Sequence, residues 1–115
     1  MFCFTKARRL LKRIDFDHVF NQAKKVTVSD FTLLYRNNEV GYSRLGLVIP
    51  KKIIAKAHDR NYIKRLIRET FRLRQDLPSC DIIVLVRKGI KSQNKAAMNA
   101  QLEEAWKKLA KLNTV

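Results

Sequence analysis

The chain has few of the residues that mark disulfide-rich, zinc-binding or membrane-spanning proteins. It holds two cysteines, three glycines and two prolines among 115 residues. Cys3 and Cys80 lack metal-ligand spacing, and the chain begins with a basic cluster where a signal peptide would have its apolar run. No segment approaches the roughly 18 consecutive apolar residues of a membrane helix. We therefore expect reduced cysteines, a cytoplasmic location and no association with a membrane.

Acidic residues are also scarce. Ten Asp and Glu stand against 25 Lys and Arg, which gives a formal net charge of +15 and a pI near 10.4. Such an excess destabilises the compact state by self-repulsion, so a polyanionic partner is expected, with nucleic acid ahead of a membrane surface. The acidic residues are scattered apart from Glu103 and Glu104, whereas protein-based phosphodiester hydrolysis typically needs a cluster that holds metal ions. We predict no catalytic and no metal-binding residue, and we expect His18 and His58 at the surface.

The hydrophobic content of 46% is sufficient for one globular domain over residues 1–115, with a basic arm at residues 1–13. The arm is extended in this prediction, and its charge is compatible with ordering on RNA binding. The apolar periodicity predicts alternating helices and strands. In chain order they are a helix capped by Asp15, a short edge strand at Val26–Ser29, strands at Phe31–Arg36 and Leu45–Ile49, a helix at Ile54–Gln75, a strand at Asp81–Val86 and a helix at Gln93–Leu112. The predicted fold is an α+β sandwich with helices on a small, mostly antiparallel sheet.

The middle helix has two faces of different chemistry. At about 100° per residue, an apolar arc about 140° wide is opposed by a polar arc of similar width. The apolar arc consists of Ile63, Leu66, Ile67, Thr70 and Phe71. The polar arc consists of Arg60, Asn61, Lys64, Arg65, Arg68 and Arg72. Solvated helix faces usually mix charges because like charges at i,i+4 repel, so this cationic face favours phosphate binding. Lys51 and Lys52 precede the helix and would add to the same potential.

The segment from His58 to Glu69, HDRNYIKRLIRE, closely resembles the signature helix of the bacterial ribonuclease P protein family. The similarity continues in FDHVF at residues 16–20, in RLGLVIPKK at residues 44–52 and in the strand after Asp81, and it spans about residues 9–109 in the same order and spacing. Three positions depart from the family pattern. Tyr62 replaces a usual Arg and is expected to pack at the edge of the core, Pro50 replaces a small residue, and Leu34 replaces an aromatic residue of some members.

The resemblance implies a function and a set of sites. The family removes the 5′ leader of precursor tRNA as a ribonucleoprotein whose RNA subunit provides the active site and binds the required Mg²⁺. By resemblance the partners are one catalytic RNA subunit per chain and precursor tRNA, with no small-molecule substrate, and the β-α-β crossover is left-handed. The residues expected to bind the RNA subunit are Lys51, Lys52, Arg60, Asn61, Lys64, Arg65, Arg68 and Arg72. The residues expected to bind the leader are Phe16, Phe20, Leu34 and Val48.

Two alternatives stay open at this point. Periodicity alone favours Phe16 and Phe20 as core residues because Val19 and Ala23 share their stripe, whereas the resemblance turns Val19 inward and leaves the two aromatic rings in a groove. A ribosomal or DNA-binding protein would also be basic and compact, although a helix-turn-helix reader would need a helix where Leu45–Ile49 predicts a strand. A stand-alone nuclease is disfavoured by the scattered acidic residues.

Overall fold

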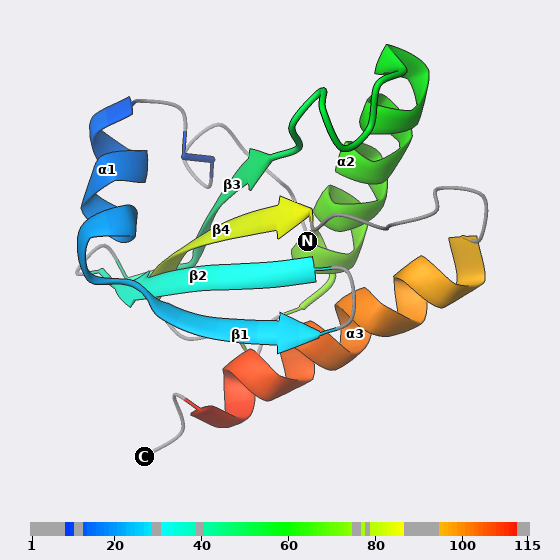
Figure 1. The fold of residues 1–115 in the computed structure, drawn as a ribbon. Helices are drawn as coiled ribbons and strands as arrows, with labels where there is room; N and C mark the ends of the chain where they lie inside the picture. The colour runs from blue at the N-terminus through cyan, green and yellow to red at the C-terminus, as the bar shows by residue number, and fades with distance from the viewer. Residues whose placement is uncertain are drawn as a thin grey trace.

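The computed structural model describes residues 9–10, 13–28, 31–38, 41–74, 77, 79–86 and 95–112. Three helices and four strands follow one another in the order α-β-β-β-α-β-α (Figure 1). They are α1 (Arg13–Gln22), β1 (Lys24–Val28), β2 (Phe31–Asn37), β3 (Arg44–Val48), α2 (Ala57–Arg72), β4 (Cys80–Val86) and α3 (Lys95–Leu112). The predicted α+β class and the order of its elements are confirmed, the short edge strand included.

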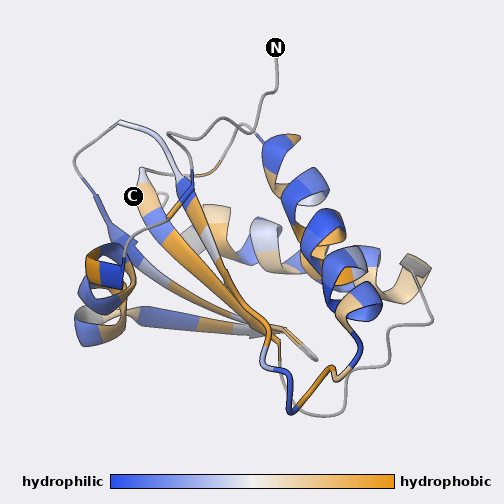
Figure 2. Ribbon diagram, turned by 90° about the horizontal axis from the view of Figure 1, so that it is seen from above, coloured by the Kyte–Doolittle hydropathy of each residue, from blue (hydrophilic) through white to orange (hydrophobic). Residues whose placement is uncertain are grey.

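The sheet has the strand order β1-β2-β4-β3. The β1–β2 and β2–β4 pairs are antiparallel, and β3 runs parallel to β4. In Figure 1, β3 lies above β4, both point to the right, and α2 connects them behind the sheet. Figure 2, seen from above, shows α1 and α2 on opposite sides of the sheet. The crossover is therefore left-handed, as the resemblance implied, against the right-handed rule that holds in about 98% of such connections.

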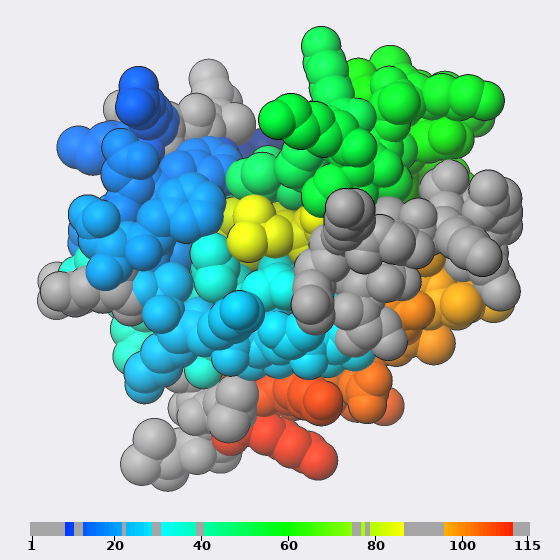
Figure 3. Space-filling model, viewed as in Figure 1, coloured from blue at the N-terminus to red at the C-terminus, as the bar shows by residue number. Residues whose placement is uncertain are grey.

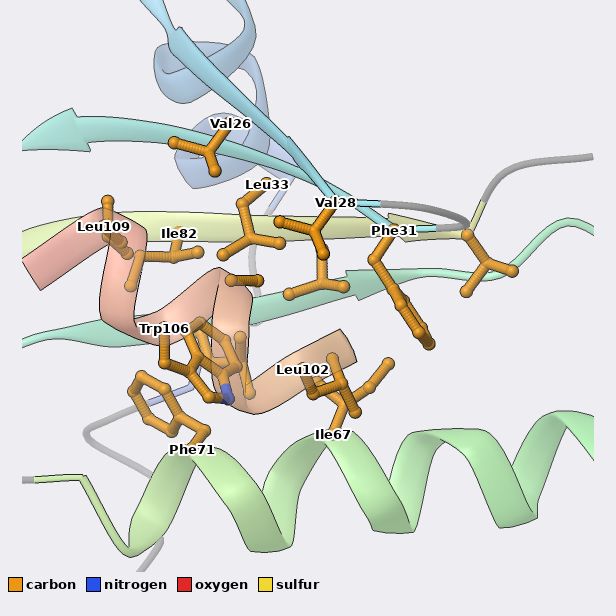
Figure 4. Packing of buried hydrophobic residues seen from close by; sticks show 14 of the residues in the cluster. Val26, Val28, Phe31, Leu33, Ile67, Phe71, Ile82, Leu102, Trp106 and Leu109 are labelled. Carbon is orange, nitrogen blue, oxygen red and sulfur yellow. The ribbon is translucent and has the colours of Figure 1, made fainter. Parts of the chain in front are cut away.

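The larger core lies between the sheet and the helices α2 and α3 (Figure 4). Alternate residues of β2 and β4 point into it, as strand geometry requires. Trp106 of α3 is fully buried, its ring centroid lies 5.6 Å from that of Phe71, and its indole N–H donates a 2.9 Å hydrogen bond to Thr70 Oγ1. The buried residues of α2 are the five of the predicted apolar arc, and Tyr62 packs at the edge of this core.

A buried ion pair joins the first residue of β3 to β4. Arg44 donates from Nε and NH2 to the two carboxylate oxygens of Asp81, each at 2.7 Å. The Asn38 amide donates to the same carboxylate at 2.9 Å. These hydrogen bonds to Asp81 raise the pKa of the Arg44 guanidinium. The pair fixes the end of the parallel strands, and neither residue stood out in the sequence.

Two predicted helix starts are wrong by a few residues. Helix α1 begins at Arg13, so Asp15 lies in its first turn and does not cap it. A carboxylate at this position still interacts favourably with the helix dipole. Helix α2 begins at Ala57 because residues 51–54 form a tight turn, in which the amides of Ile53 and Ile54 both donate to the Pro50 carbonyl at 3.1 Å. Ile53 and Ile54 in that turn continue the apolar spacing of the helix, so the sequence pattern places the helix start too early.

Candidate RNA-binding surfaces

The predicted cationic face of α2 points away from the core. Asn61, Arg65 and Arg68 are exposed, and Lys64 and Arg72 are half-buried. These five side chains line one open depression of about 430 Å³ along the helix, together with Glu69 and Arg9. The structure thus brings together five of the eight residues predicted to bind the RNA subunit. Their binding role stays a prediction.

Two arginines of this helix have local partners. Arg60 NH1 donates to the carbonyl oxygens of Ile54 at 3.0 Å and Ala55 at 2.8 Å, so the side chain also closes the turn that leads into α2. Arg72 NH2 lies 2.8 Å from a carboxylate oxygen of Glu69, which lowers the pKa of that carboxyl group. Glu69 is not a member of the predicted cationic arc, and through this ion pair it offsets the charge of Arg72.

Lys51 and Lys52 lie in the tight turn between β3 and α2, and both are exposed. They are not among the residues that line the depression on α2. They lie before the start of the helix, at a separate place in the fold, and their role in RNA binding stays a prediction.

The second candidate surface lies on the opposite side of the sheet, where α1 packs against β2, β3 and β4. Val19 is fully buried there, whereas Phe20 is 47% exposed and Phe16 is half-buried. The interpretation of both phenylalanines as core residues is therefore wrong for Phe20. Phe20 follows Val19 about 100° further around the helix, so burying Val19 against the sheet leaves the Phe20 ring facing outward.

The Phe16 ring lies directly over the backbone of Gly46 in β3. A Cβ atom built at Gly46 would lie 2.7 Å from the Phe16 ring, closer than real Cβ atoms approach other carbons. Glycine at this position therefore allows the ring to pack against the strand. Leu34 and Val48 are half-buried and pack against the same small cluster as Phe16. Part of β4 is visible between α1 and α2 in Figure 3, so this face of the sheet is only partly covered.

Arg9 is a residue that the sequence reasoning did not assign to a site. It forms an isolated parallel bridge with Leu45, and the amide of Leu10 donates to the Leu45 carbonyl at 2.8 Å. Leu10 is buried beside Val19 and Ile83. In the sequence, the apolar Leu10 directly after Arg8 and Arg9 is the feature that could have indicated a contact with the core. The rest of the predicted arm, residues 1–8 and 11–12, lies outside the described residues.

The remaining expectations concern titratable groups and membrane segments. His18 and His58 are both exposed. Within the described ranges, no three His, Cys, Asp or Glu side chains gather where they could hold a metal ion. Cys80 is a free, buried thiol whose pKa is raised to about 12 by burial. None of the helices that the structure describes is long and apolar enough to cross a membrane.

Comparisons with known proteins agree with this geometry. The ribonuclease P family model matches residues 4–110. The ribonuclease P protein component of Legionella pneumophila (strain Corby) is 56% identical over 110 residues, which cover 96% of each chain. That of Edwardsiella ictaluri (strain 93-146) is 42% identical over 106 residues, which cover 91% of this chain and 89% of the relative.

Solved structures show the same fold. The RNase P protein of Staphylococcus aureus superposes with a TM-score of 0.81 at 34% identity, over 89% of this chain and 94% of that one. The protein from Thermotoga maritima superposes with a TM-score of 0.76 at 34% identity, over 87% and 96%. The chain therefore belongs to the ribonuclease P protein family, and its role lies in ribonuclease P and tRNA processing.

Proposed function

We propose that the chain binds the catalytic RNA subunit of ribonuclease P through α2 and the 5′ leader of precursor tRNA through α1 and the sheet. By holding both, it promotes endonucleolytic removal of the leader. The observation that supports this most is the pairing of two surfaces of different chemistry on one small domain. One is cationic and the other is aromatic and apolar, and they lie on opposite sides of the sheet (Figure 2).

The cationic surface suits a folded RNA. Each phosphate that a Lys or Arg neutralises releases condensed counterions, which favours binding and makes it depend on salt. Arg65 and Arg68 are exposed guanidinium groups one helical turn apart, and they can each donate two hydrogen bonds to a phosphate. Lys51 and Lys52 would extend these contacts toward the turn before α2.

The surface around α1 suits a single strand. Base stacking on an aromatic ring contributes about 1–3 kcal/mol per base and depends little on sequence. Phe20 offers an exposed ring and Phe16 a half-buried one, while Leu34 and Val48 provide apolar contact beside them. Recognition of many different leaders requires this tolerance of sequence.

We assign the chemistry of cleavage to the RNA subunit. The described part of the chain offers no cluster of metal ligands, so in this proposal the Mg²⁺ ions that cleavage requires are bound by the ribonucleoprotein's RNA. The chain's own residues bind and orient RNA, in an expected complex of one protein with one RNA subunit in the cytoplasm.

Arg65→Ala tests the first surface. Arg60→Ala is a poorer choice because it would also remove hydrogen bonds that close the turn before α2. We expect Arg65→Ala to weaken binding of the RNA subunit and to reduce the slope of log K against log salt by about 1. Lys108→Ala, a matched charge removal at an exposed position of α3, should leave the slope unchanged. Equal slopes for Arg65→Ala and the wild type in a filter-binding titration would refute the assignment.

A further inference from the structure

A further depression lies beside α1, outside the two candidate surfaces. Its volume is about 580 Å³, within the range of about 300–1,000 Å³ that is typical of small-molecule sites. Its helical wall is formed by Ile14, Asp15 and His18. At about 100° per residue, these positions share one flank of α1, roughly opposite the flank that carries Phe16 and Phe20. The helix therefore separates this depression from the surface assigned to the leader.

A row of three charged side chains forms the floor of the depression. Arg36 of β2, Asp81 of β4 and Arg44 of β3 are paired in register across adjacent strands, so their side chains point to the same face of the sheet. It is the face that α1 covers, because Ile83, two residues after Asp81, belongs to one buried cluster with Val19. In Figure 1 these ends of the three strands lie at the left of the sheet, beside α1.

Hydrogen bonds hold the floor and the helical wall in place. Asp81 accepts from Arg44 and from Asn38. Arg36 NH1 donates to the His18 carbonyl oxygen at 2.8 Å, which joins β2 to α1. The Arg36 guanidinium thus lies against the helix at His18, whose own side chain is exposed. The site is therefore organised before any ligand binds.

The charges around this depression balance one another, unlike those of the whole chain. Two arginines and two aspartates are among the described residues that line it, so their formal charges cancel. Asp15 lies near Arg44, because its negative charge adds to the effect of the Asp81 hydrogen bonds in raising the pKa of the Arg44 guanidinium. In a chain with a net charge of +15, such a lining favours a neutral polar group over a phosphate.

An unpaired nucleobase has the properties that this lining matches. It is flat and uncharged, and it carries hydrogen-bond donors and acceptors along its edge. Proteins bind such bases by stacking them on His rings or Arg planes and by hydrogen bonding to their edges. His18 and Arg36 offer flat groups here. The Asp15 carboxylate can accept hydrogen bonds, and the Asn37 amide can both donate and accept them.

We propose that this depression binds one unpaired nucleobase of an RNA, on the flank of α1 opposite the leader surface. The proposal rests on the proposed function and adds a contact to a base where the basic helix offers contacts to phosphates. Two RNAs can supply the base, namely the leader of the precursor and an unpaired segment of the RNA subunit, and the titrations below separate them.

Asp15→Asn is the sharpest test, because simple electrostatics predicts a change of the opposite sign. Removal of a negative charge from an RNA-binding protein should strengthen its binding to a polyanion. Loss of a carboxylate that accepts from a base should instead weaken binding, by about tenfold, and leave the salt slope unchanged because no phosphate contact is lost. Asp17→Asn is the matched control. It removes the same charge from an exposed position outside the depression and should not weaken binding.

His18→Ala tests the stacking contact and leaves the hydrogen bond from Arg36 to the backbone in place. Its control is Asn21→Ala, at an exposed position of α1 outside the depression. Affinity is measured against salt in two titrations, one of protein with the RNA subunit and one of holoenzyme, at saturating protein, with leader-bearing precursor and with mature tRNA. Loss in the first identifies a base of the RNA subunit, and loss confined to the precursor identifies a base of the leader.

We expect Asp15→Asn and His18→Ala to weaken the same titration, each by about tenfold, with urea midpoints close to that of the wild type. Binding by Asp15→Asn that equals or exceeds that of the wild type would overturn the proposal, as would a His18→Ala variant that behaves like Asn21→Ala. A salt slope that falls by about 1 would indicate a lost phosphate contact and would also overturn it. If the wild-type chain bound neither RNA, the proposed function itself would fail, which is a distinct result.

Discussion

The neighbouring residues Val19 and Phe20 should respond in opposite ways to truncation. Val19 is fully buried between α1 and the sheet, whereas Phe20 is 47% exposed on the same helix. If the α1 surface binds the leader, Val19→Ala should lower the stability of the protein with little direct effect on binding. Phe20→Ala should lower leader affinity with little effect on stability.

The magnitudes follow from burial. Val19→Ala removes two buried carbons at about 0.8 kcal/mol each and leaves a cavity, so we expect a loss of about 2–3 kcal/mol in the free energy of unfolding. Phe20 keeps nearly half of its surface in water, so its truncation should cost about 1 kcal/mol of stability. Loss of one stacking contact should weaken binding of a leader-bearing precursor by about 1–3 kcal/mol, or roughly 5- to 150-fold.

Urea denaturation measures the first quantity, and holoenzyme titrations with precursor and mature tRNA measure the second. Mature tRNA is the control substrate because it lacks the leader. If Phe20→Ala weakened binding of both substrates equally, or destabilised the protein as much as Val19→Ala, Phe20 would be a core residue and the assignment of this surface would be wrong.

Three further predictions concern the interior. Asp81→Asn should lower the free energy of unfolding by about 3 kcal/mol in urea titrations, because it leaves the largely buried Arg44 without a charged partner; a loss below about 1 kcal/mol would contradict this. Thr70→Val should cost about 2 kcal/mol by the same measurement, since it leaves the buried Trp106 N–H unpaired with little change in volume, and an unchanged midpoint would argue against that hydrogen bond. In a Cys3→Ser background, the Cys80 thiol should resist a thiol reagent at pH 8 until the protein unfolds. Rapid labelling of the folded protein would contradict this expectation. The pKa of Cys80 is about 12 in the folded protein against 9.0 for the ordinary thiol, so the thiol ionises first in the unfolded chain. The free energy of unfolding should therefore be unaffected by this group below pH 9 and should fall by up to about 1.4 kcal/mol per pH unit between pH 9 and 12.

The sequence predicts the large periodic elements well because burial imposes their pattern. The apolar arc of α2 matches its buried residues, and the run after Asp81 is a central strand in which all residues but one are buried. The start of α2 could not be predicted, since Ile53 and Ile54 pack against the core from a turn rather than from a helix. The left-handed crossover came only from the family resemblance, because no local pattern encodes it.

The candidate surfaces were predictable to different extents. A helical wheel finds the cationic face of α2 because all its members lie on one element. The bidentate Arg44–Asp81 pair could not be found in this way, since its two residues are 37 positions apart on different strands. Periodicity also could not decide whether Phe20 faces the core. Among the described side chains of α1 only Val19 is fully buried, and one buried residue defines no clear apolar stripe.

The central claim is that the chain acts as an RNA-binding subunit in leader removal and that its RNA partner performs the chemistry. Incubation of precursor tRNA and Mg²⁺ with the protein alone, with the RNA subunit alone and with both tests it most directly, at an ionic strength low enough for the protein to bind. We predict that the protein alone leaves the precursor intact and that adding it to the RNA subunit increases the rate of cleavage at the mature 5′ end. Cleavage by the protein alone, or an unchanged rate in the combined reaction, would contradict the account.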